Sequence, residues 1–294
     1  MKILFIGCVE SSKLLLEGLM ECDAEIVGVI TKKSSDFNAD FFDLSEVCRQ
    51  HGLDFIYVNN INEEVSVNYI RGKEPDLIYC FGWSQLISKS IIDIPTKGII
   101  GFHPAELPYN RGRHPIIWTL ALGLDRTAST FFYITEGADE GDIVSQKVIP
   151  VAFEDTAGTL YDKIMKEAVM QVKEFTKQFG SNTVIPVKQD NSKANYWRKR
   201  TVRDGEIDWR MSTIGIYNLV RALTKPYIGA HFIHNEHMYK VWSVKIIKCS
   251  DFKNMEYGKI LKVNDDGSFL IKAGDGVLLV DKCDLIQLKE GEYM

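Results

Sequence analysis

The opening segment reads KILFIG (residues 2–7), SKLLLEGLMEC (12–22) and EIVGVIT (25–31), and it decides the fold. The first and third stretches are short, apolar and β-rich, whereas the second has the three-to-four-residue apolar spacing of an amphipathic helix. A strand, a helix and a second strand in this order are typical of a parallel sheet with crossover helices.

The same rhythm continues through the first half of the chain. A helix is expected over 40–52, and further strands over 54–58, 76–82 and 98–103. Open parallel sheets bind their ligands beyond the carboxyl ends of the strands. We therefore look for chemistry in the loops that follow Gly7, Gly82 and His103.

The second half of the chain changes character. The spacing of apolar residues predicts a long helix from Thr156 to Gly180, and the stretch 186–203 is a polar linker or surface strap. After one more helix over 212–223, short strands with Asp-Gly turns predict a small β-barrel or meander. The predicted architecture is a Rossmann-like α/β domain over 1–195 followed by a mostly β domain over 196–294.

Composition limits the classes of function. The 294 residues are 45% hydrophobic and 26% charged, as in an ordinary globular protein, and carry a net charge of -5. With a pI near 5.8, this charge disfavours a protein whose main surface binds nucleic acid. The apolar part of MKILFIGC is too short for a signal peptide, and no run is long enough to span a membrane, so we expect a cytoplasmic protein.

The cysteines and the clustered histidines have no metal-ligand or disulfide pattern. The cysteines are expected to be reduced core thiols: Cys8, Cys22, Cys48, Cys80, Cys249 and Cys283. His231, His234 and His237 follow one another at three-residue spacing, which places neighbouring members on opposite faces of a strand. No metal site is expected.

Residues 98–146 carry the unusual chemistry. His103 ends a predicted strand and is followed by a loop rich in proline and arginine, while Asp139 lies in an acidic, glycine-rich turn. A histidine at the mouth of the sheet can act as a general base if a carboxylate orients it and stabilises its charged form. From the residues alone, a structural hydrogen-bonding role for His103 and a solvated turn around Asp139 are the commoner interpretations, and catalysis stays open beside them.

The longer pattern resembles a known family. His103-x4-Pro108-x2-Arg111-Gly112-x2-Pro115-x2-Trp118, followed by Gly137-x-Asp139-x-Gly141-Asp142, is similar to the signature of the folate-dependent formyltransferases. The similarity extends to about residue 180 and resumes over 200–209, where it resembles the sugar-modifying branch. The 36-residue separation of His103 from Asp139 also fits this family.

The resemblance implies transfer of a formyl group from 10-formyltetrahydrofolate to an amine without a metal. His103 would take the proton of the amine, and Asp139 would orient His103. The implied folate-binding residues are Trp83, Ser84, Gln85, Leu86, Ile87, Thr135, Glu136, Gly137 and Ala138. From the residues alone, the apolar members of 83–87 could instead begin a helix and pack inward.

One position departs from the family pattern. Relatives have Asn-x-His at the end of the strand, whereas this chain has Gly101-Phe102-His103. The asparagine would help to stabilise the oxyanion, and the loss of one such donor lowers a rate by about 100- to 1,000-fold. Asn110, another donor, a backbone N–H or a water could replace it, or the activity could be lost.

The resemblance favours a nucleotide-linked amino sugar as acceptor, specifically a UDP- or dTDP-linked 4-amino-4,6-dideoxy sugar of surface-glycan biosynthesis. The tRNA-modifying branch has a basic insertion after its second strand, but here residues 31–43 hold two lysines and three aspartates. The implied substrate-binding residues are Glu10, Ser11, Lys73, Asn110, Arg113 and Tyr227.

Three other functions stay open: a methionyl-tRNA formyltransferase, a formyltetrahydrofolate hydrolase, and a non-catalytic binding homologue. Hydrolases of this kind are expected to carry an accessory domain before the core, whereas here the core begins at residue 1. The sequence is compatible with a homodimer formed through the β domain.

Overall fold

The computed structural model describes residues 1–35, 40–248, 252 and 254–294, and they divide into two compact units. Unit 1 comprises residues 1–115, 126–150 and 162–198, and unit 2 comprises residues 116–125, 151–161 and 199–294. Cys249 and the part of the 31–43 segment at 36–39 lie outside the described residues.

Unit 1 is built on a seven-stranded sheet with the order β3-β2-β1-β4-β5-β7-β8. Its strands are β1 (Lys2–Ile6), β2 (Glu25–Thr31), β3 (Phe55–Tyr57), β4 (Leu77–Cys80), β5 (Ile99–His103), β7 (Arg126–Tyr133) and β8 (Ile143–Pro150). The first five strands are parallel, which confirms the predicted sheet, whereas β7 and β8 add an antiparallel edge that the sequence did not predict.

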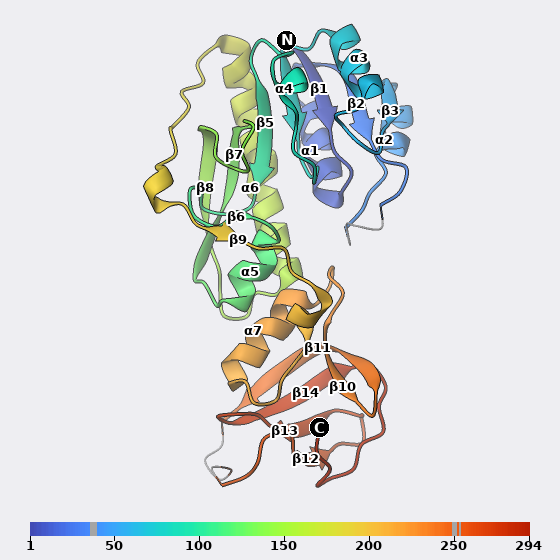
Figure 1. Cartoon of the computed structure of the whole chain (residues 1–294), viewed down its shortest axis with the longest axis vertical. Coiled ribbons are helices and arrows are strands. Elements are labelled where there is room, and N and C mark those ends of the chain that lie inside the picture. Colours follow the sequence, from blue (N-terminus) through green and yellow to red (C-terminus); the bar gives the residue numbers. More distant parts are fainter. Residues whose placement is uncertain (36–39, 249–251, 253) are drawn as a thin grey trace. The chain divides into compact units, whose positions relative to one another are not determined.

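Helices connect the strands of unit 1 and cover both faces of the sheet (Figure 1). They are α1 (Glu10–Met20), α2 (Ser45–His51), α3 (Glu64–Lys73), α4 (Lys89–Ile92) and α6 (Ala157–Ser181), the last of which begins in unit 2. On one face, Tyr79 and Phe131 pack edge-on or tilted against Phe175 of α6. On the other face, apolar residues of β1, β2 and β4 form one core cluster with α3 and α4.

A polar strap follows α6, as the sequence predicted for 186–203. It contains the short helix η1 (Asn191–Lys193) and strand β9 (Tyr196–Trp197), which pairs in parallel with β6 (Arg111–Gly112). Backbone hydrogen bonds therefore link the strap to the loop that follows β5.

Unit 2 contains a five-stranded antiparallel sheet with the order β10-β11-β14-β13-β12. Its elements are α5 (Pro115–Ala121, of which Pro115 belongs to unit 1), η2 (Val202–Gly205), α7 (Thr213–Leu223), β10 (Ala230–His234), β11 (His237–Ile247), β12 (Ile260–Val263), β13 (Phe269–Lys272) and β14 (Val277–Cys283). The mostly β character is confirmed, but a simple meander is wrong because β11 pairs with β14.

The histidines of unit 2 form no cluster of three. His231 is buried, and His234 lies 3.1 Å from Glu292. The expectation that neighbours lie on opposite faces is wrong for His234 and His237, because the hairpin pairs them across the turn. In the described part of the chain no group of three or more His, Cys, Asp or Glu could hold a metal.

The cysteines are free thiols where they are described. Cys8, Cys48 and Cys80 are buried, as expected for core residues, and burial raises the pKa of Cys48 to about 11. Cys22 and Cys283 are only partly buried, so they belong to the margin of the core. Among the same residues, no helix combines the length and the apolar character of a membrane span.

Candidate active site

His103 is the last residue of β5, near the middle of the sheet and at the carboxyl edge of its parallel strands. The side chain is 5% exposed. Its Nε2 lies 2.8 Å from the backbone oxygen of Asn110. A carbonyl oxygen only accepts, so Nε2 carries a hydrogen in this arrangement.

Asp139 lies in the turn between β7 and β8, and its carboxylate points at the other side of the His103 ring. The distance from Asp139 Oδ2 to His103 Nδ1 is 3.6 Å. The same oxygen accepts a 2.9 Å hydrogen bond from the backbone N–H of Gly112. A carboxylate in this place stabilises positive charge on the ring and fixes the orientation of the imidazole.

Asn110 contributes its backbone to the site and keeps part of its side chain available. Its N–H donates to Asn195 Oδ1 over 2.8 Å, and its own Oδ1 accepts from Asn195 Nδ2 over 3.2 Å. The Nδ2 group of Asn110 donates no hydrogen bond within the described part of the chain. The side chain of Asn110 thus offers an amide donor, and the backbone oxygen of the same residue contacts His103.

Gly101 lies on the same side of β5 as His103, two residues earlier. A Cβ atom at this position would lie 3.0 Å from Phe132 Cζ and 3.0 Å from Ile134 Cγ1. A side chain at position 101 would therefore require Phe132 and Ile134 to shift by a few tenths of an ångström.

The loop after β4 carries the first set of implied folate-binding residues. Residues 83–88 are irregular and α4 begins at Lys89, so these residues do not begin a helix. Ile87 is buried and Leu86 is 63% exposed. Trp83 packs against the core cluster, and Lys32 Nζ lies 4.9 Å from the centre of its ring.

Gln85 has a structural role in this loop. Its Oε1 accepts from Trp83 Nε1 and from the N–H of Ile61, and its Nε2 donates to the oxygen of Asn59. The side chain thus holds two loops together. The backbone oxygen of Ser84 accepts a 3.2 Å hydrogen bond from Arg113 Nη1, which links the loop after β4 to the loop that follows His103.

The second set of implied folate-binding residues forms the turn that leads to Asp139. Thr135 Oγ1 is buried and has no hydrogen-bond partner among the described residues. Gly137 lies against the Glu140 carboxylate, which leaves no room there for a Cβ atom.

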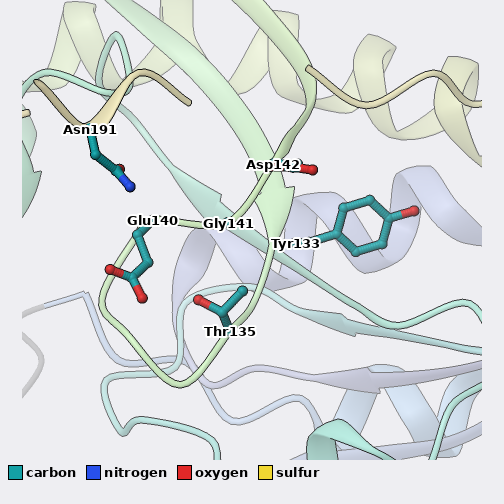
Figure 2. A pocket seen from close by; sticks show the side chains of 6 residues that line it. All are labelled: Tyr133, Thr135, Glu140, Gly141, Asp142 and Asn191. Carbon is teal, nitrogen blue, oxygen red and sulfur yellow. The ribbon is translucent and has the colours of Figure 1, made fainter. Parts of the chain in front are cut away.

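A cavity of about 360 Å³ adjoins this turn (Figure 2). Its lining residues are Tyr133, Thr135, Glu140, Gly141, Asp142 and Asn191. Thr135 and Glu140 lie on the same side of the turn, whereas the side chains of Tyr133 and Asp142 point away from them (Figure 2). The turn is therefore a structured element with an open space beside it.

The implied substrate-binding residues are not all brought together. Glu10 and Ser11 begin α1, just beyond the carboxyl end of β1 and at the same sheet edge as His103. Lys73 ends α3 just before β4, at the amino ends of the parallel strands and thus at the end of the sheet opposite His103. It forms a 2.6 Å ion pair with Asp54. Tyr227 belongs to unit 2.

Two further residues bear on the site and were not singled out as functional in the sequence. Arg111 is 1% exposed, although it carries a charge, and Gln189 of the strap is 5% exposed. Arg111 donates to the side-chain oxygens of Gln189, Asn191 and Tyr196, none of which is charged. No sequence signal beyond the motif position of Arg111 marks this pair.

Family models match both parts of the chain. Residues 1–174 match the formyl transferase model, and residues 199–294 match the model of the formyl transferase C-terminal domain. The chain belongs to the formyl transferase family. This membership confirms the resemblance drawn from the His103 and Asp139 motifs.

This formyl transferase is similar both to methionyl-tRNA formyltransferases and to an N-formyltransferase solved with a nucleotide sugar. It is 30% identical over 281 residues to the methionyl-tRNA formyltransferase of Bacillus licheniformis, covering 94% of this chain and 88% of that one. It is 29% identical over 282 residues to the corresponding enzyme of Agathobacter rectalis, with 95% and 90% covered. The fold is also similar to that of an N-formyltransferase from Helicobacter canadensis in complex with folinic acid and dTDP-3-aminofucose (TM-score 0.70, 17% identity, 95% and 98% covered).

Proposed function

We propose that this formyl transferase moves the formyl group of 10-formyltetrahydrofolate to the amine of a nucleotide-linked amino sugar. The observation that carries the proposal is the His103–Asp139 pair at the carboxyl edge of the sheet, with Nδ1 and Oδ2 3.6 Å apart. A buried imidazole beside a carboxylate is the arrangement that acyl transfer to an amine needs, because the nucleophile must lose a proton as it attacks.

His103 is the proton acceptor in this proposal. The nitrogen of the amine bonds to the formyl carbon and the amine proton passes to the imidazole. The imidazole then gives this proton to the folate nitrogen as the bond from the formyl carbon to that nitrogen breaks. Nε2 carries a hydrogen toward the oxygen of Asn110 at 2.8 Å. An amine that uses this nitrogen must displace that carbonyl, and the ring must hold its hydrogen on Nδ1, beside Asp139, before Nε2 can accept a proton. Asp139 balances the charge that the ring gains.

Asn110 is the proposed substitute for the absent asparagine. Negative charge develops on the formyl oxygen during attack, and a preorganised amide donor stabilises it. The Nδ2 group of Asn110 is free to donate, while Asn195 holds the rest of the side chain. An asparagine at position 101 would make tight contacts with Phe132 and Ile134, which favours a donor elsewhere in the loop.

The residues of the loop after β4 and of the turn that leads to Asp139 fit the flat ring of a folate, which has polar edges. Trp83 and the exposed Leu86 offer apolar surface. The buried hydroxyl of Thr135, which has no partner among the residues that the structure describes, offers a hydrogen bond. Pockets for such ligands combine an apolar wall with a few placed polar groups. The formyl donor supplies the acyl group, and these residues would hold it beside His103.

The charge of the chain supports a small acceptor over a polynucleotide. A net charge of -5 works against a large phosphate-binding surface. The fold similarity to an enzyme complexed with dTDP-3-aminofucose supports a nucleotide sugar. Glu10, Ser11 and Arg113 are the proposed acceptor contacts within unit 1. Lys73 is not retained, because it lies at the end of the parallel strands opposite His103.

Methionyl-tRNA is the second candidate acceptor. It is favoured by the 29% and 30% identity to two methionyl-tRNA formyltransferases over most of both chains. The two candidates share the same donor and the same His103 chemistry. They differ in the acceptor alone, so one assay separates them.

The test follows tetrahydrofolate release from 10-formyltetrahydrofolate by absorbance. The acceptors are UDP- and dTDP-linked 3-amino and 4-amino sugars and, separately, initiator methionyl-tRNA. Release that requires an amino sugar supports the proposal, and release that requires the tRNA selects the second candidate. Release without any acceptor would indicate a hydrolase, and folate binding without release would indicate a non-catalytic homologue.

A further inference from the structure

Gln189 connects the buried Arg111 to the turn that carries Asp139. Its Oε1 accepts from Arg111 Nη2 over 2.7 Å and from Arg111 Nε over 3.2 Å. Its Nε2 donates to the backbone oxygen of Asp139 over 2.9 Å and to that of Gly141 over 2.6 Å. One side chain, 5% exposed, thus makes four hydrogen bonds.

The orientation of this amide is fixed by its partners. Arg111 offers only donors and the two backbone oxygens offer only lone pairs. A flipped amide would place its NH₂ group against the guanidinium and its oxygen against two carbonyls. The NH₂ group of Gln189 must therefore face the turn.

The turn needs such support, because Asp139 has a left-handed backbone conformation with φ of +57°. Non-glycine residues are uncommon in this region and persist where the surroundings hold them. The two carbonyls that Gln189 binds lie at Asp139 itself and two residues later. With both fixed, the Asp139 carboxylate meets the N–H of Gly112 and the His103 ring.

We propose that Gln189 is a positioning residue of the formyl-transfer site, which acts on His103 through the backbone of the Asp139 turn. The inference rests on the proposed function for its kinetic consequence, but its structural part stands without it. Gln189 comes from the strap, 50 residues after Asp139 in the sequence. The strap thereby becomes part of the catalytic apparatus without contacting substrate.

Two substitutions separate positioning from general stability. Gln189→Glu keeps an acceptor for Arg111 and removes both donors to the turn. Gln189→Met removes the acceptor as well and leaves a buried guanidinium with fewer partners. If Gln189 positions Asp139, Gln189→Glu stays folded at the assay temperature while its kcat falls about 10- to 100-fold, with KM for both substrates changed less than about twofold.

The second readout is independent of activity. The N–H of Gly112 donates to Asp139 Oδ2, whereas the flanking amides of Arg111 and Arg113 donate to Asn195 and Trp197 in the strap. Amide hydrogen exchange, resolved by residue in NMR spectra, should therefore be faster at Gly112 in Gln189→Glu and unchanged at the two flanking amides. Asp139→Ala, which removes the acceptor, gives the reference for a fully released Gly112 amide.

Tyr196→Phe is the matched control. It removes one acceptor of Arg111, the phenol oxygen 3.0 Å from Nη1, and leaves the turn untouched. Parental kcat and parental Gly112 exchange are expected. The proposal is overturned if Gln189→Glu keeps parental Gly112 exchange, or if Gly112 exchange rises in Tyr196→Phe to the same extent. If the exchange result holds but no acceptor supports turnover, the proposed function fails and the positioning stands.

Discussion

His103 and Asp139 are 36 positions apart in the sequence, and the structure places Nδ1 of the first 3.6 Å from Oδ2 of the second. Each member of the pair is also held by the backbone of another residue. The backbone of Asn110 holds the histidine ring, and the N–H of Gly112 holds the carboxylate. Both supports belong to the loop that follows His103, so this loop contributes to the geometry of the pair on both sides.

Substitution of either member should abolish most of the activity and leave the fold intact. We expect His103→Asn or Asp139→Asn to lower kcat at least about 100-fold, the scale for loss of a general base or its orienting partner. Asparagine at 139 keeps an oxygen that can accept from Gly112. Steady-state kinetics with matched circular dichroism spectra make the measurement, and near-parental kcat in a folded variant would remove the pair from the mechanism.

Restoring the family's asparagine at position 101 should not help. In Gly101→Asn the new side chain meets Phe132 and Ile134 at about van der Waals contact or closer, and overpacking of this kind lowers stability by about 1 to 3 kcal/mol. Denaturant unfolding and kcat are the readouts. Gly180→Asn, at a site with no atom near the new Cβ, is the control and should unfold like the parent. A faster enzyme with an unchanged unfolding midpoint would contradict this account of Gly101.

Arg221 should be the most sensitive arginine of unit 2. Its Nη1 donates to the backbone oxygens of Ala152, Phe153 and Asp155, and the side chain is 7% exposed. We expect Arg221→Met to lower the free energy of unfolding by about 2 to 4 kcal/mol, since it removes the hydrogen bonds that a largely buried charged group donates to three backbone oxygens. Thermal and urea unfolding give the value.

The control for Arg221 is Arg210→Met. Arg210 forms an exposed ion pair with Asp208 in the same unit, and such pairs contribute little. Its unfolding midpoint should stay at the parental value. Equal losses in the two variants would mean that burial of the Arg221 guanidinium is not what stabilises this region.

His231 should make unit 2 less stable in mild acid. Burial, with a smaller effect of Lys240, lowers the pKa of His231 below its ordinary value. The unfolded chain then binds the proton more readily, so stability falls as the pH drops below the unfolded pKa of about 6.5. The fall in the unfolding midpoint between about pH 7.5 and pH 5.5 should be smaller in His231→Gln. His237→Gln, at an exposed position, should keep the parental pH dependence.

The sequence predicted the parallel core because β1, β2 and β4 are continuous apolar runs, and it placed His103 at a strand end for the same reason. It missed β7, in which Thr127, Ser129 and Thr130 are buried. The hydroxyl groups of Thr127 and Thr130 donate to the oxygens of Pro104 and Ala105, so the loop after His103 satisfies these two threonines. No local pattern shows such a contact.

Polar contacts between distant segments account for the other differences. Gln189 has no periodicity to mark it, since its role depends on Arg111 78 residues earlier. Lys73 has the chemistry of a phosphate ligand, but it lies just before β4 and therefore at the amino ends of the parallel strands, away from His103. Gln85 was predicted to bind folate from its place in the family resemblance. Its hydrogen bonds with Ile61 and Asn59 join segments that are distant in the sequence, so only the structure shows them.

The most direct test of the central claim is a competition for labelled formyl groups. The enzyme is given 10-[¹³C]formyltetrahydrofolate with an equimolar mixture of UDP- and dTDP-linked amino sugars and initiator methionyl-tRNA, and the label is located by mass spectrometry. The account predicts label on the amine of a nucleotide sugar, absent with Asp139→Asn. Label found on methionyl-tRNA or released as formate, with the sugars unlabelled, would contradict it.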